Sequence, residues 1–347
     1  ILFLFSSFAC AQSDRNDTVI KINPTIFDTV HYAVSKKVVY GSNYLDTTIS
    51  RWLSGDKNIS CVSKPLHPDT REKEIDSFFQ NSRYLNETKD IFIRLRLNSY
   101  FYSKKNNKFN VRLNAQLPFS RCKRRWKIFI QDMSYNDEKE IRPEENSGKL
   151  GIGIRYYKKE QHGITSNYSL GLNGAHPYVR ARFGLPFLIN NWDIEPVQIF
   201  KYSSKYYFKE ETNIYFDRFV KNNNLFRFKI HRETQTKKKG MDYAFSFEYY
   251  MNFKKSTGFR LSQTFFGNTH YKDNPSDLKV YNGINNYETS LSWRANTWRK
   301  WFYYEIRPTV NFDRKYDYKA SYALRFFIDI YFGNYHKITA PTKYVDF

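Results

Sequence analysis

The chain has 347 residues, 19% of them aromatic, and its 56 Lys and Arg against 34 Asp and Glu give a formal net charge of +22. This length accommodates one large domain or two ordinary ones. No run approaches the roughly 18 consecutive apolar residues of a membrane-spanning helix, which excludes a helical span in the mature chain. A transmembrane β-barrel remains open, because its signal is a weaker alternation. The 31 Phe and 29 Tyr residues in so polar a chain favour strands.

The first residues, ILFLFSSFACAQS, have the composition of the apolar part of a secretory signal peptide. We assign residues 1–11 to this signal, with Cys10 as a lipoprotein cysteine as the alternative. Export would place Cys61 and Cys122 in an oxidising compartment, which permits a disulfide between them but does not require one. Two free thiols are the alternative.

Residues 12–88 lack sustained alternation and contain the clearest helical patterns. Apolar residues at helical spacing predict one helix over 42–54, and a second is expected to begin near Asp69 or Thr70, with acidic residues in its first turn. The stretch between them, SGDKNISCVSKPLHPDT, has linker composition. We expect a small helical or irregular periplasmic segment, and the sequence leaves open whether it plugs the barrel.

Residues 321–332, SYALRFFIDIYF, show the alternation on which the fold prediction rests. Side chains of a strand point alternately to its two faces. One face here is wholly apolar, whereas the other mixes Arg325 and Asp329 with aromatic residues. Twelve residues are enough to cross a bilayer at a tilt, which takes about 9 to 11. This pattern is typical of a strand with lipid on one side and a polar interior on the other.

The same alternation recurs along the chain from Asp90. An unpaired backbone group in hydrocarbon costs several kcal/mol, so a membrane sheet must close on itself. We therefore predict an all-β fold, a transmembrane antiparallel β-barrel of about 14 strands over 89–334, with 12 strands as the alternative and a tail over 335–347. The predicted strands are 91–103, 111–117, 126–130, 150–156, 168–173, 179–185, 193–202, 208–216, 226–230, 243–249, 259–265, 287–293, 302–312 and 321–332.

The connections divide into two kinds. Short gaps alternate with longer charged ones, notably 134–147, 235–240 and 268–286. If the short turns face the periplasm, both ends of the barrel lie there. Aromatic residues at strand ends indicate interfacial girdles; they are Trp126, Trp192, Trp293, Trp298, Trp301, Tyr303 and Phe332.

Four stretches carry a resemblance to a known class of protein: IDSFFQNSRYLNETKD, FIRLRLNSY, FNVRLNAQLPFSRCKRRWKIFIQD and PYVRARFGLPF. With them the chain resembles outer-membrane β-barrel proteins of Gram-negative bacteria, and more narrowly an uncharacterised family of that class. The resemblance extends in pattern over most of 75–334. It implies a fold and a location in the outer membrane, and no activity.

The two faces of the predicted strands give the candidate site residues. Arg and Lys exceed acids on the polar face, and rings of such residues favour anions in pores. This predicts a narrow porin or channel with a positively biased lumen, or else an interior packed with Arg, Glu and Tyr that makes a structural envelope barrel. The lumen candidates are Arg94, Arg96, Arg112, Arg155, Arg180, Arg182, Arg227, Glu248, Arg260, Glu288, Glu305, Arg307, Arg325 and Asp329. The lipid-facing candidates are Leu95, Leu97, Leu113, Ile152, Phe183, Phe245, Leu291, Leu324 and Ile328.

Other functions have weaker support. The sequence contains no G-x-S-x-G, CxxC or HExxH motif, so we expect no enzyme activity, metal or cofactor. His231 and Glu233 share a strand face, which keeps an outer-membrane lipid-modifying enzyme as an alternative, and a secreted soluble β-sandwich that binds a partner is another. The expected partners are outer-membrane lipid, lipopolysaccharide and small anionic solutes, because export argues against nucleic acid. The oligomeric state is left open.

Overall fold

The structure is a computed structural model. It describes residues 25–54, 71–79, 81, 92–104, 106–118, 125–132, 150–205, 207–221, 224–253, 257–272, 279–296, 299 and 301–333. The predicted signal peptide, the Cys61 to Cys122 bridge, Trp298 and the tail over 335–347 lie outside these residues.

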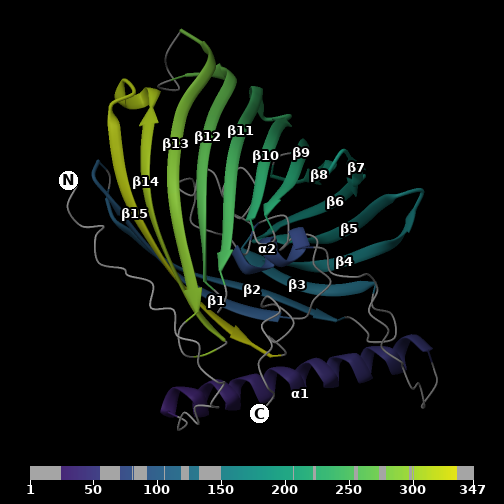
Figure 1. Cartoon of the computed structure of the whole chain (residues 1–347). Helices are drawn as coiled ribbons and strands as arrows, with labels where there is room; N and C mark the ends of the chain where they lie inside the picture. The colour runs from purple at the N-terminus through teal and green to yellow at the C-terminus, as the bar shows by residue number, and fades with distance from the viewer. Residues whose placement is uncertain are drawn as a thin grey trace.

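The strands form one antiparallel sheet that closes into a barrel (Figure 1). Each wall strand pairs with its neighbours along the chain, β1 pairs with β15, and β6 pairs with β8, which completes a ring of 14 strands. The predicted barrel is confirmed, and the alternative of a β-sandwich is wrong. The wall strands are β1 (Phe92–Tyr102), β2 (Lys108–Pro118), β3 (Trp126–Asp132), β4 (Leu150–Gln161), β5 (Ile164–Asn173), β6 (His176–Gly184), β8 (Trp192–Ser203), β9 (Tyr207–Lys221), β10 (Asn224–Gln235), β11 (Lys238–Phe253), β12 (Thr257–Tyr271), β13 (Tyr281–Asn296), β14 (Phe302–Asp313) and β15 (Ala320–Phe332).

Two details differ from the sequence prediction. A short extra strand, β7 (Phe187–Ile189), pairs with the start of β8. The expected loop over 235–240 is mostly strand, because β10 runs to Gln235 and β11 begins at Lys238. The backbone pairing of β10 and β11 continues through these polar residues to Gln235 and Lys238, so a polar sequence does not mark the end of a strand.

The two faces of the wall have opposite character, as the alternation predicts. On the outside, Leu324 is 45% exposed and Leu97 is 37% exposed, whereas Arg96 and Asp329 are buried inside. All nine lipid-facing candidates lie on the outer face; their contact with lipid stays a prediction. An apolar outside around a polar inside is the arrangement of bacterial outer-membrane β-barrels.

Two helices precede the barrel. The first, α1 (Ile26–Ser54), lies at the end of the barrel where β1 begins and β15 ends (Figure 1). The second, α2 (Arg71–Phe79), is where the sequence predicts a helix, and it lies within the barrel. Within the described part of the chain, neither helix is long and apolar enough to cross a bilayer.

Candidate functional site

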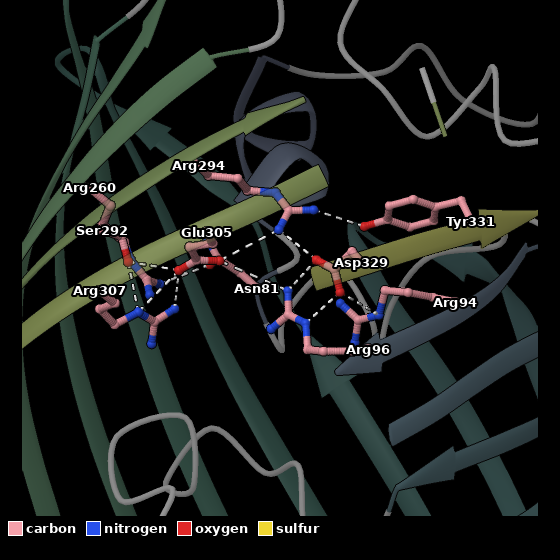
Figure 2. A network of polar contacts seen from close by, with 10 residues as sticks. All are labelled: Asn81, Arg94, Arg96, Arg260, Ser292, Arg294, Glu305, Arg307, Asp329 and Tyr331. Atoms are coloured by element: carbon pink, nitrogen blue, oxygen red, sulfur yellow. Dashed lines mark hydrogen bonds and ion pairs between the residues drawn. The ribbon is translucent and has the colours of Figure 1, made fainter. Parts of the chain in front are cut away.

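A network of charged side chains covers the lumen face of β1, β13, β14 and β15 (Figure 2). The register places Arg96 of β1 directly opposite Asp329 of β15. Arg96 donates from Nε and Nη2 to the two carboxylate oxygens of Asp329, both at 2.6 Å, and Arg294 Nη1 donates to Asp329 Oδ2 at 2.6 Å. The Nε atom of Arg94 lies 4.0 Å from Asp329 Oδ1. One buried carboxylate is thus surrounded by three guanidinium groups.

A second acid, Glu305 of β14, continues this network. Arg307 Nη2 donates to Glu305 Oε1 at 2.6 Å, and the hydroxyl of Ser292 donates to the same oxygen at 2.8 Å. Glu305 Oε2 lies 3.5 Å from Arg294 Nη1 and 4.0 Å from Arg96 Nη2. Arg96 and Arg294 therefore link the two acids, so the polar groups of four adjacent strands form one connected unit (Figure 2).

On the wall at β9 and β10, an arginine holds α2 in place. Arg227 of β10 donates to Asp217 of β9 from Nε and Nη2, at 2.7 and 2.8 Å. It also donates from Nη1 and Nη2 to the carboxylate of Asp76 in α2, at 2.6 and 3.1 Å. The amide of Asn81 donates to Asp76 Oδ1 at 2.7 Å and to the hydroxyl of Tyr250 at 3.0 Å. Because such buried charges need their partners, these contacts fix α2 against the wall.

Apolar packing adds to these polar contacts. Phe78 and Phe79 of α2 are each 2% exposed. Phe79 packs edge-on against Tyr250 of β11 with ring centroids 5.1 Å apart, and Phe78 packs against Tyr303 of β14 at 6.1 Å. A Cβ atom at Gly258 would come within 2.9 Å of Phe78 and 3.0 Å of Phe79. Glycine at this point of β12 thus lets the two rings reach the wall.

The described buried residues carry a positive excess. Thirteen are Lys or Arg and nine are Asp or Glu, one of which, Asp76, comes from α2. Further pairs join strands: Arg325 of β15 donates to Glu288 of β13, across β14, at 2.9 and 3.1 Å, and Arg182 Nη2 of β6 donates to Glu195 of the adjacent β8 at 3.3 Å. The interior is therefore a densely cross-linked polar surface with a basic bias.

All fourteen lumen candidates lie on the inner face of the wall. Arg180 and Glu248 are partly exposed there, and the other twelve are buried. Six of them, including Arg260, which donates to Asn81 at 3.2 Å, belong to the network of Figure 2, and Arg227 belongs to the contact with α2. The others line the wall elsewhere or pair between strands, as Arg325 does with Glu288.

Sequence reasoning missed several important contacts. Asp76 and Asn81 were not expected in the lumen, and Tyr303, which we placed in an aromatic girdle, is buried inside the barrel against Phe78. Tyr303 was therefore wrong as a girdle residue. The sequence of α2 gives one hint that it packs inside the barrel, which is that acidic and apolar residues lie close together in its nine residues, REKEIDSFF.

The candidate catalytic pair is engaged in structural contacts. The Nδ1 atom of His231 lies 2.7 Å from Asn213 Oδ1. The carboxylate of Glu233 forms an ion pair with Lys209, whose Nζ atom lies 2.6 Å from Glu233 Oε2. Within the described ranges, no group of three or more His, Cys, Asp or Glu side chains could hold a metal ion. The absence of enzyme activity stays a prediction.

Known proteins match this chain in structure alone. No protein-family model matches the chain, and no curated protein matches it. Among solved structures it is similar to an anion-selective porin from Comamonas acidovorans, at 6% identity and a TM-score of 0.43, over 70% of this chain and 99% of that one. It is also similar to a loop L8 deletion mutant of OmpT, an outer membrane protein of Vibrio cholerae, at 7% identity and a TM-score of 0.42, over 70% and 98%. A bacterial polysaccharide outer membrane secretin matches at 12% identity and a TM-score of 0.40, over 69% and 98%. At such low identities we draw no functional conclusion from these similarities.

Proposed function

We propose that this protein is an integral outer-membrane barrel that acts as a narrow porin-like channel for small anions, with its passage restricted by α2. Two observations carry the proposal. The buried residues of the lumen include more Lys and Arg than Asp and Glu, and Asp76 of α2 forms an ion pair with Arg227 of the wall. Cationic linings favour anions in pores. A helix held by one buried ion pair and two aromatic contacts is an internal constriction that a limited change could loosen.

The location of the protein follows from its surface. Leu97, Leu261 and Leu291 are exposed on an outer face that no described part of the chain covers, and hydrocarbon is the environment that a closed barrel with such a face requires. We place both ends of the barrel in the periplasm and its loops among lipopolysaccharide. Exposed lysines such as Lys104 and Lys319 in those loops could meet the phosphates of that layer.

Replacing Asp76 with Asn is the test of the constriction. The change removes the charge that Arg227 binds from α2 and leaves the pair between Arg227 and Asp217 in place. We expect Asp76→Asn to raise single-channel conductance, or the fraction of time spent open, in planar bilayers. Glu160→Gln, at an exposed site on β4, is the matched control and should conduct like the unmodified protein. Equal conductance for all three would contradict a restricting role for α2.

The charge bias makes a separate prediction. Arg180 and Arg182 lie on the lumen face of β6, and Arg180 is partly open to solvent. Replacing both with Gln should lower the anion-over-cation permeability ratio, measured as the reversal potential in a salt gradient. An unchanged ratio would remove these two residues from the ion pathway.

A structural role for the barrel is the second candidate. It is favoured by the connected network around Asp329 and Glu305, which joins four strands into a stiff wall. This alternative predicts no conductance from the unmodified protein and none from Asp76→Asn, although both insert into the bilayer. Conductance in either one would favour the channel.

A further inference from the structure

The N-terminal part of α1 is fixed to the rim of the barrel. The ring of His31 stacks on Trp301 with centroids 4.1 Å apart and an angle of 7° between the planes, and lies 5.3 Å from the ring of Phe332. Its Nε2 atom is 2.6 Å from the carbonyl oxygen of Tyr331. Burial lowers the pKa of His31, although that carbonyl and Asp28 oppose the shift, so the docked ring favours its neutral form.

Two further contacts extend this anchor. Asp28 forms an ion pair with Arg299, in the turn between β13 and β14. The backbone N–H of Gly333, just after β15, donates to Ser35 Oγ at 3.4 Å. Asp28, His31 and Ser35 fall on one side of α1 at helical spacing, and this side faces the barrel.

The anchor lies on the outer side of the rim. Phe332 is the last residue of the outward-facing row of β15, which also contains Leu324 and Ile328. The helix lies next to β15 and also next to β2, and β1 is the strand between them in the wall. Figure 1 shows α1 lying across the strand direction at this end of the barrel. Since the membrane plane is perpendicular to the barrel axis, α1 is oriented along the membrane surface.

A second side of α1 is apolar and uncovered. Ile26 is 76% exposed, Phe27 74%, Val30 59% and Val34 38%. At about 100° per residue these four positions form one stripe next to the side that holds the barrel. On the side away from both, Thr29, Tyr32 and Lys36 are exposed, and the exposed Lys37 lies at the C-terminal end of the stripe. A stripe of this kind beside a polar side is the pattern of helices that lie in a membrane interface.

We infer that α1 is an interfacial helix whose stripe, Ile26, Phe27, Val30 and Val34, inserts into the periplasmic leaflet of the outer membrane beside β15, β1 and β2. Lipid is the occupant because His31, which borders the stripe, packs against Phe332 at the end of the apolar outer row of β15. The orientation of the helix along the membrane surface fits the same occupant. This inference rests on the proposed outer-membrane location. It gives α1 a role that α2 does not share, since α2 is held inside the barrel.

The test uses the full-length protein with its three cysteines replaced by Ser and one new cysteine labelled with nitrobenzoxadiazole. Labels are compared at Val30→Cys and Val34→Cys on the stripe, at Lys36→Cys on the polar side, and at Leu324→Cys on the barrel wall. The protein is reconstituted in phosphatidylethanolamine and phosphatidylglycerol vesicles. We expect blue-shifted emission and quenching by nitroxide-labelled lipid at residues 30, 34 and 324, and water-like emission at 36.

Two results would overturn the inference. If residue 324 is quenched and residues 30 and 34 behave like 36, the barrel is in the membrane but α1 is not at its surface. If labels at 30 self-quench in proportion to the protein-to-lipid ratio, a second copy of the chain covers the stripe. Water-like emission at 324 as well would instead contradict the proposed membrane location and remove the basis of the inference.

Discussion

Replacing Asp329 with Ala is expected to lower the free energy of unfolding by about 3 to 5 kcal/mol, the usual cost of removing one partner from a buried ion pair. The Asp329 side chain is fully buried, and it binds Arg96 through two hydrogen bonds and Arg294 through one. Without it, the three guanidinium groups of Arg94, Arg96 and Arg294 would remain in the interior, and Glu305 lies 3.5 Å from Arg294 and 4.0 Å from Arg96. The loss should therefore be larger than that of a single surface pair.

This prediction is checked by urea unfolding of the protein reconstituted in lipid vesicles, followed by tryptophan fluorescence. Glu160→Ala, which removes an exposed carboxylate from β4, is the control and should change stability by less than about 1 kcal/mol. Asp329→Asn separates charge from shape, because it keeps the size of the side chain. If Asp329→Ala unfolds at the same urea concentration as Glu160→Ala, the network is not a stabilising element of the wall.

Placing an arginine on the outer face should have an effect of similar size. Leu324 lies on the outward row of β15 and is 45% exposed in the isolated chain. If that row contacts hydrocarbon, Leu324→Arg should cost about 2 to 4 kcal/mol, the range for a charged side chain near the bilayer midplane. The same row carries Tyr322, which lies nearer to the hairpin end of the strand. Tyr322→Arg should cost less, down to about 0 to 1 kcal/mol at the interface.

The difference between these two arginine variants is the informative quantity, because both add the same side chain to the same face. It is measured by the same unfolding experiment in vesicles. A dependence on depth would show that lipid contacts the row. Equal and small losses would mean that the outer face of β15 meets water, and the proposed location would then be wrong.

The sequence predicts which residues face into the barrel and which face out, because side chains alternate between the two faces along each strand. In 321–332 the apolar and polar positions separate cleanly, so Arg325 and Asp329 could be placed inside without knowing their partners. Those partners could not be predicted. Arg96 and Asp329 are separated by 233 positions along the chain, and only closure of the ring brings β1 next to β15.

The placement of the helices was harder to predict. Residues 71–79 carry a helical pattern, but nothing local shows that Asp76 pairs with Arg227 inside a barrel. The first half of α1 was missed because Val30, Val34, Val38 and Val39 favour strands by propensity. The helix forms there against the rim, where His31 packs between Trp301 and Phe332, and such tertiary contacts override local preference.

The central claim is that alternate residues of each strand contact lipid while the others line an enclosed polar interior. A nitroxide scan of residues 322–330 along β15 in vesicles tests it most directly, with collision rates measured for oxygen, which partitions into lipid, and for a water-soluble nickel chelate. We predict a period of two, with oxygen access highest at 324, 326 and 328 and low collision with both reagents at 325, 327 and 329. High nickel access at the even positions, or no alternation, would contradict the account.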